Sequence, residues 1–253
     1  MTDMLSKRAS GHREHAAPSF RLLAAEIRYL PDLMLARRKP VTMHRSDVGQ
    51  GAPVMTLPGF CANDDSMKQM RFNLNAAGFA AKRWKMGRNL GARLDTMERI
   101  HARVQDIADK SGQRVNLVGW SLGGIMAREY ARNHPDHVAS VITMGSPFSG
   151  SLKANHAWRL YQIVAGHKID DMPVPIDPGL KPPVPTFALW SSRDGVIAIA
   201  SARGEAHQSD VIREVDCGHL GFAFDPAAID AVIDCLIEAR DAAPATGFPE
   251  TPQ

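Results

Sequence analysis

Cysteine is scarce in this 253-residue chain, which contains only Cys61, Cys217 and Cys235. An odd number of cysteines without metal-ligand spacing argues against both a disulfide framework and a zinc site. The sequence therefore predicts a reducing, cytoplasmic location and no bound metal.

Long apolar runs are also missing. No stretch approaches the roughly 20 apolar residues that a membrane-spanning helix requires. The first 19 residues lack the apolar segment and the small-residue cleavage site of a secretory signal. We therefore expect neither a transmembrane helix nor a secretory leader.

Charge of either sign is close to balanced, with 30 basic and 27 acidic residues and a formal net charge of +3. Such a small excess does not provide the electrostatic footprint of a nucleic-acid-binding protein. Nucleic acid is therefore excluded as the expected partner. The basic excess is concentrated in residues 1–50, which contain nine Lys or Arg against five Asp or Glu.

The amino-terminal part of the sequence predicts a flexible leader over residues 1–18 and a helical segment over 19–39, interrupted at Pro31. This segment is basic and amphipathic, which is compatible with contact at a membrane surface. The same pattern arises when a helix packs on its own domain, and we favour that interpretation. At the other end, residues 241–253 predict a disordered tail.

Residues 40–240 alternate short apolar segments with longer amphipathic ones, which predicts one α/β domain. The expected strands are 53–59, 79–86, 115–118, 138–145, 186–192 and 210–216, and the expected helices are 66–78, 95–112, 122–133 and 226–240. In the expected helix 95–112, Asp95 is placed to cap the start and Gly112 to end it. Strict alternation indicates a mostly parallel sheet with helices on both faces. A proline-rich interruption at 147–185 predicts a lid insertion.

The segment Gly119-Trp120-Ser121-Leu122-Gly123-Gly124 lies between an expected strand and an expected helix. A G-x-S-x-G sequence in that setting is typical of a nucleophile elbow, in which a strained turn exposes the serine hydroxyl. The flanking glycines leave room for the strand and helix to approach. We therefore expect Ser121 to be a nucleophile and the Leu122 N–H to be one oxyanion donor.

A serine nucleophile requires a base, and the base requires an acidic partner, in the chain order Ser, Asp or Glu, His for this type of elbow. Asp194 and His219 each follow an expected strand, and His219 alone among the ten histidines has a strand before it, glycines in its loop and a helix after it. We expect His219 to be the base. Asp194 is the preferred acid, with Asp216 as the alternative.

Further site residues are predicted from position. The loop Leu57-Pro58-Gly59-Phe60 follows the first expected strand, where the Phe60 N–H would supply a second oxyanion donor. Trp120, beside the nucleophile, is a candidate for substrate contact. The lid carries further aromatic candidates, which fit packing within the lid equally well: Phe148, Trp158 and Tyr161.

With these residues in place, the chain from about residue 41 to 240 resembles the α/β-hydrolase family, and in particular bacterial serine esterases and lipases. The segments that carry the likeness are "LPGF", "LVGWSLGG", "TMGSPFSGS", "SRDGVI" and "GHLGF". The resemblance implies cleavage of a small acyl ester or lipid through an acyl-enzyme, without a cofactor. A thioesterase, acyltransferase or amidase would use the same groups. A non-catalytic binding or scaffold protein is the alternative of a different class.

Overall fold

The computed structural model describes residues 17–31, 47–91, 95–150 and 179–242. The strands in these ranges are β1 (Pro53–Leu57), β2 (Ala80–Arg83), β3 (Val115–Trp120), β4 (Val138–Met144), β5 (Thr186–Trp190) and β6 (Val211–Glu214). They form one six-stranded sheet in the order β2-β1-β3-β4-β5-β6, and every neighbouring pair within these ranges is parallel. The predicted α/β class is confirmed.

The longer helices alternate with the strands as the sequence predicts. They are α4 (Lys68–Ala76), α5 (Thr96–Ser111), α6 (Leu122–Asn133) and α9 (Pro226–Ala242). The shorter ones are α2 (Phe20–Ala25), η1 (Glu26–Tyr29), η2 (Asp64–Met67), η3 (Pro135–His137), α8 (Ile199–Arg203) and η5 (Leu220–Ala223). The sequence did not predict α8, because five residues are too few to establish a helical period.

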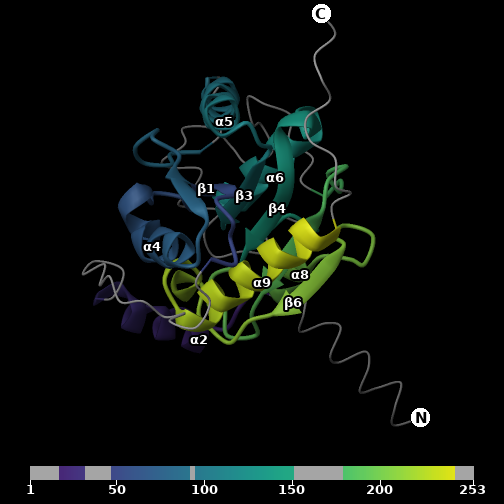
Figure 1. Ribbon diagram of the computed structural model, residues 1–253. Helices are drawn as coiled ribbons and strands as arrows, with labels where there is room; N and C mark the ends of the chain where they lie inside the picture. Colours follow the sequence, from purple (N-terminus) through teal and green to yellow (C-terminus); the bar gives the residue numbers. More distant parts are fainter. Residues whose placement is uncertain (1–16, 32–46, 92–94, 151–178, 243–253) are drawn as a thin grey trace, which may run out of the picture.

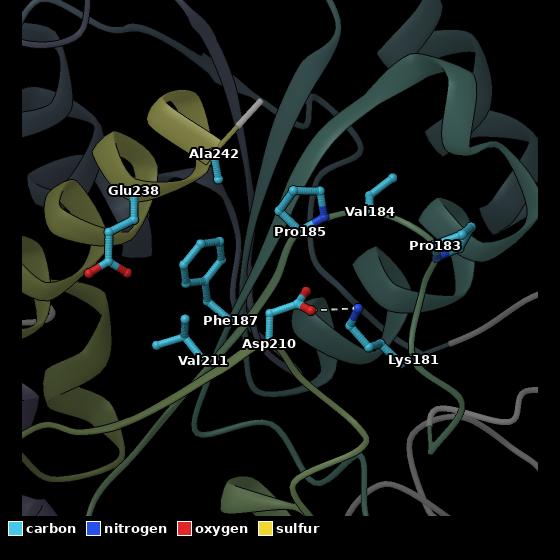
Figure 2. A pocket seen from close by; sticks show the side chains of 9 residues that line it. All are labelled: Lys181, Pro183, Val184, Pro185, Phe187, Asp210, Val211, Glu238 and Ala242. Carbon is cyan, nitrogen blue, oxygen red and sulfur yellow. Dashed lines mark ion pairs between the residues drawn. The ribbon is translucent and has the colours of Figure 1, made fainter. Parts of the chain in front are cut away.

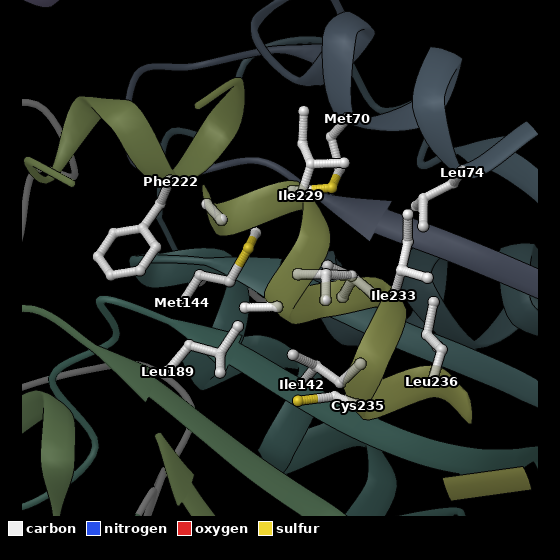
Figure 3. Close-up of a cluster of buried hydrophobic side chains, with 14 of the residues drawn as sticks. Met70, Leu74, Ile142, Met144, Leu189, Phe222, Ile229, Ile233, Cys235 and Leu236 are labelled. Carbon is white, nitrogen blue, oxygen red and sulfur yellow. The ribbon is translucent and has the colours of Figure 1, made fainter. Parts of the chain in front are cut away.

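Two hydrophobic layers cover the two faces of the sheet (Figure 1). On one face α4 and α9 pack over residues of β3, β4 and β5, and Figure 3 shows this cluster with Met70, Leu74, Ile142, Ile233 and Leu236 interdigitated. On the other face α5 and α6 pack over β1, β3 and β4. Helices on both faces are the arrangement that a buried parallel sheet requires.

Helix α5 illustrates how the sequence sets these elements. Its buried apolar residues Ile100, Val104 and Ile107 recur at helical spacing. Gly112 ends the helix in the left-handed region at φ 65°, as predicted. Asp95 occupies the N-cap position but makes no cap hydrogen bond, because its backbone is already helical and its carboxylate lies 3.5 Å from Arg99.

The register brings the carboxyl ends of the strands together. Leu57 lies beside Gly119, and Trp120 lies beside Met144. Trp190 in turn lies beside Glu214. The loops that follow β1, β3, β4, β5 and β6 therefore meet at one edge of the sheet, where ligands bind in parallel sheets.

Several predicted segments lie outside the described residues. They are most of the leader (1–16), the second part of the amino-terminal segment (32–39), the central part of the lid insertion (151–178) and most of the tail (243–253).

Candidate active site

Ser121 occupies the turn between β3 and α6. Its backbone has φ 53° and ψ −120°, a region that non-glycine residues rarely adopt. The Ser121 N–H donates to the Met144 carbonyl at 2.8 Å, so the strand ladder with β4 continues up to this turn. Strain at such a turn is typical of functional positions.

The glycines around Ser121 allow close backbone contacts, as predicted. A Cβ atom on Gly119 would lie 2.4 Å from the Gly124 Cα. A Cβ on Gly123 would lie 2.3 Å from the Leu57 carbonyl oxygen. Any larger side chain at either position would push α6 away from the ends of β1 and β3.

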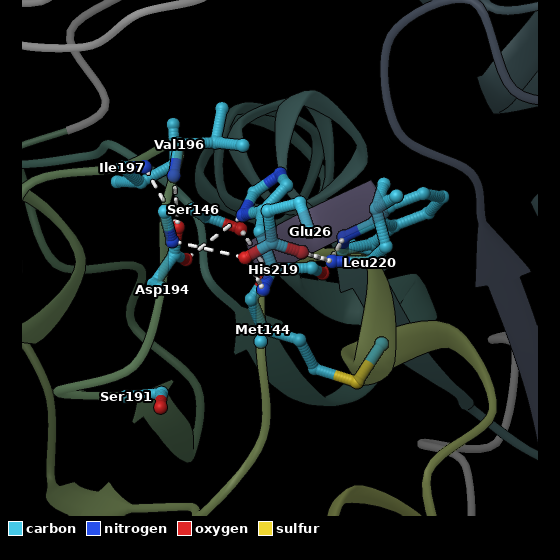
Figure 4. A network of polar contacts seen from close by, with 12 residues as sticks. Glu26, Met144, Ser146, Ser191, Asp194, Val196, Ile197, His219 and Leu220 are labelled. Atoms are coloured by element: carbon cyan, nitrogen blue, oxygen red, sulfur yellow. Dashed lines mark hydrogen bonds and ion pairs between the residues drawn. The ribbon is translucent and has the colours of Figure 1, made fainter. Parts of the chain in front are cut away.

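Asp194 and His219 meet at the same edge of the sheet, from the loops after β5 and β6 (Figure 4). The Nδ1 atom of His219 lies 2.8 Å from Oδ2 of Asp194, and both side chains are buried. The other oxygen, Oδ1, accepts the backbone N–H groups of Val196 and Ile197 at 2.8 and 2.7 Å. The Asp194 carboxylate is therefore held at both oxygens, with one of them directed at the imidazole.

Asp216, the alternative acid, lies elsewhere. Its carboxylate pairs with Arg193 at 2.6 Å and its side chain is 75% exposed. Of the two aspartates left open by the sequence, the structure brings Asp194 to His219.

The surroundings of His219 shift its pKa. Burial opposes the charged form of His219 and is the largest single effect, but the charge and hydrogen bond of Asp194, together with the charge of Glu26, outweigh it. Glu26 acts in the same direction as Asp194, and the pKa of His219 is raised above its ordinary value.

Gly145, which follows β4, makes room for this pair. Its φ is 53°, and a Cβ atom there would lie 3.0 Å from Oδ2 of Asp194 and 2.9 Å from the ring of Phe222. The first glycine of the "GSPFSG" segment is therefore required both by its backbone conformation and by the approach of the carboxylate.

The loop after β1 lies against Ser121. A Cβ atom on Gly59 would be 3.3 Å from the Ser121 Cβ, so this loop packs closely against the serine turn. Asn89, which sequence analysis missed, fixes this loop: its side-chain amide donates to the Pro58 carbonyl at 2.8 Å. Its own carbonyl accepts from the Cys61 N–H, and its N–H donates to the Ala62 carbonyl, both at 2.8 Å.

Two of the four aromatic candidates for substrate contact are buried. Trp120 is 3% exposed, and its indole N–H donates to the carbonyl of His219 at 3.0 Å. Phe148 is 2% exposed and lies 4.2 Å beneath the Arg128 guanidinium. Trp120 thus supports the loop of His219 instead of lining an open surface. Trp158 and Tyr161 lie outside the described residues.

The amino-terminal segment contributes two side chains that sequence analysis missed. Glu26 and Tyr29 are buried, and both accept hydrogen bonds from the His219 loop. These two side chains lie against the domain, whereas Phe20 and Ile27 of the same segment are exposed. The sequence offers one weak signal for this role, since Glu26 is the only acidic residue in 17–31.

A surface hollow of about 560 Å³ lies away from this site (Figure 2). It is placed at the amino ends of β5 and β6, with Pro185, Phe187 and Val211 as an apolar wall and an ion pair of 2.7 Å between Lys181 and Asp210.

The residues described include no group of three or more His, Cys, Asp or Glu placed to hold a metal ion. None of the helices described combines the length and apolar character needed to cross a membrane.

Comparison with solved structures gives matches at low sequence identity. Aspergillus fumigatus lipase B is 17% identical, with a TM-score of 0.54 over 76% of this chain and 54% of that one, so the chain spans about half of that lipase. A Paleococcus ferrophilus monoacylglycerol lipase is 17% identical, with a TM-score of 0.54 over 75% of this chain and 96% of that one. A bacterial membrane phospholipase A is 17% identical, with a TM-score of 0.53 over 96% and 100%.

Comparison with curated protein sequences gave no match. A family model described as "alpha/beta hydrolase fold" matches residues 54–167, which include β1, β3, β4 and the Ser121 turn. Together with the parallel sheet and its strand order, this match identifies the chain as a protein of the α/β-hydrolase fold.

Proposed function

We propose that the chain is a serine hydrolase that cleaves carboxylic esters through Ser121, His219 and Asp194. The single observation that carries the proposal is the buried bond of 2.8 Å between His219 and Asp194, at the sheet edge where Ser121 occupies its strained turn. The presence of lipases among the structural neighbours supports a small acyl ester or lipid as the substrate.

The mechanism depends on which nitrogen of the His219 ring is available to accept the Ser121 proton. Because Nδ1 of His219 carries its proton toward Asp194, Nε2 is the unprotonated nitrogen and accepts the Ser121 hydroxyl proton. The serine oxygen bonds to the ester carbonyl carbon, and the N–H groups of Phe60 and Leu122 stabilise the resulting oxyanion.

Collapse of this intermediate breaks the ester C–O bond, and the His219 imidazolium returns the proton to the leaving alcohol. A water molecule then repeats the sequence on the acyl-enzyme, releasing the acid and restoring Ser121. Comparable oxyanion donors contribute on the order of 3 kcal/mol each to the barrier reduction.

The test is covalent labelling with a fluorophosphonate probe, followed by turnover of p-nitrophenyl esters of increasing acyl length. We expect the wild type to be labelled and Ser121→Ala to lose both labelling and hydrolysis. Ser111→Ala, which changes a serine at the end of α5, is the matched control and should behave as wild type.

The outcomes separate the remaining classes. A wild type that is neither labelled nor active would favour a binding or scaffold role, and labelling that survives Ser121→Ala would contradict the choice of nucleophile. Labelling without ester turnover would shift the proposal to thioesters or amides, which the same chemistry cleaves.

A further inference from the structure

The Glu26 carboxylate lies between the two loops that carry Asp194 and His219 (Figure 4). Its Oε1 accepts the Gly195 N–H at 2.9 Å and the His219 N–H at 2.7 Å, and its Oε2 accepts the Leu220 N–H at 3.0 Å. One side chain therefore binds the residue after Asp194, His219 itself and the residue after His219.

The hydrogen bonds to Glu26 are strong because the acceptor is a buried carboxylate. Glu26 is only 6% exposed, and hydrogen bonds from N–H groups to a carboxylate are about twice as strong as bonds between neutral groups. A carboxylate buried in this way requires its donors, and the donors require the carboxylate, so the two loops are tied to η1 and to each other.

The loops are shaped to receive this segment. A Cβ atom on Gly195 would lie 2.4 Å from the Leu22 carbonyl oxygen. A Cβ on Gly218 would lie 2.3 Å from the Tyr29 ring and 2.9 Å from Oε1 of Glu26. The Tyr29 hydroxyl accepts the Gly218 N–H at 2.8 Å. Both loops thus have glycine where the amino-terminal segment makes its closest approach.

We propose, on the basis of the function proposed above, that Glu26 is a positioning residue: its carboxylate holds the Asp194 and His219 loops in the geometry that the reaction requires. Its negative charge also favours the imidazolium that forms during the reaction. The amino-terminal segment then completes the site instead of merely covering it.

Titratable groups from each element packed against His219 act on its pKa. Asp194 comes from the loop after β5 and Glu26 from η1, and both favour its charged form. Tyr29, also from η1, contacts the His219 loop through the hydrogen bond of its hydroxyl with the Gly218 N–H. Cys217, from the loop of His219, is uncharged because burial raises the pKa of its thiol. Loss of the Glu26 charge should therefore lower the pKa of His219.

The primary variant is Glu26→Gln, which keeps one acceptor oxygen and removes the charge. Glu26→Ala removes all acceptors and serves as the stronger perturbation. We expect kcat/KM for a p-nitrophenyl ester to fall about 10- to 100-fold in Glu26→Ala and less in Glu26→Gln, chiefly through kcat, because small displacements of reacting groups have effects of this size. Glu98→Gln, at an exposed glutamate near the start of α5, is the matched control and should match wild type.

A second readout distinguishes positioning from structural support. The acid limb of the pH profile of kcat/KM should shift to lower pH in Glu26→Gln, and NMR titration of His219 in a Ser121→Ala background should show the same decrease without any turnover. A purely structural role would lower stability and leave both pKa readouts unchanged.

The outcomes are decisive for each proposal separately. If the wild type hydrolyses esters while folded Glu26→Gln retains its kcat and its His219 pKa, the role of Glu26 is refuted and the proposed function stands. If the wild type is neither labelled nor active, the proposed function fails first, and the role of Glu26 in that reaction fails with it.

Discussion

Each oxygen of Asp194 has a different partner, which explains why this aspartate can orient His219. Oδ1 is held by two backbone N–H groups and Oδ2 faces Nδ1 of the imidazole. An amide in place of the carboxylate would keep the shape but present either a donor to Nδ1 or a neutral acceptor. The residue therefore sets the tautomer as well as the position of the base.

From this geometry, Asp194→Asn should reduce kcat/KM about 10³- to 10⁴-fold with little change in KM, because the wrong tautomer is stabilised. Steady-state ester hydrolysis measures the loss. Asp216→Asn, at the exposed aspartate paired with Arg193, is the control and should remain near wild type. An equal loss in both variants would contradict the assignment of the acid.

The raised pKa of His219 predicts how activity depends on pH. The free enzyme is active when His219 is neutral, and its pKa is raised because the effects of Asp194 and Glu26 outweigh burial. Activity should therefore decrease as the pH falls, with the acid-side midpoint of kcat/KM above the ordinary histidine value of 6.5. A midpoint at or below that value would show that another group controls this limb.

At the level of elements, the helices on the α5 and α6 face carry a histidine cluster. His134 follows α6 and stacks on His101 of α5, with ring centroids 4.3 Å apart, and His137 lies 5.7 Å from His101. Partial burial lowers the pKa of His134, and the two neighbouring histidines lower it further. The packing of α5 on α6 therefore favours the neutral form of the His134 imidazole.

This cluster predicts a pH dependence of stability. Because the folded-state pKa of His134 lies below its unfolded value of 6.5, the unfolded chain binds more protons as the pH falls, and stability is lost on the acid side. His134→Gln should lose less melting temperature than wild type between about pH 7.5 and about pH 5.5. His207→Gln, at a 74% exposed histidine, is the matched control. An identical decline in wild type and His134→Gln would refute the prediction.

At the scale of the whole molecule, stability should depend on the two layers that cover the sheet. Ile233 is fully buried in α9 and Ile27 is 66% exposed in η1. Ile233→Ala should lower the free energy of unfolding by about 2 to 5 kcal/mol, since it removes a buried side chain and leaves a cavity. Ile27→Ala should change it by less than about 0.5 kcal/mol. Urea denaturation compares the two, and equal losses would contradict the burial assignments.

Much of this arrangement could be predicted from sequence because it depends on local patterns. The bounds of α6 match the prediction, and Ser121, Asp194 and His219 each follow a strand whose end must lie at the same edge of a parallel sheet. Contacts by side chains from distant segments could not be predicted in that way. Asn89 reaches Pro58 across 31 residues and Glu26 reaches Gly195 across 169, and neither contact leaves a periodic pattern.

The distance in sequence between Glu26 and its partners also determines when they can meet during protein synthesis. Leu220 follows Glu26 by 194 residues, so the segment is synthesised well before the loops that bind it. Domains fold as synthesis proceeds from the amino terminus, but this segment must wait until the His219 loop has left the ribosome. Docking of η1 therefore cannot precede synthesis of the His219 loop, and a chain interrupted before residue 219 lacks both the proposed base and the loop that Glu26 binds.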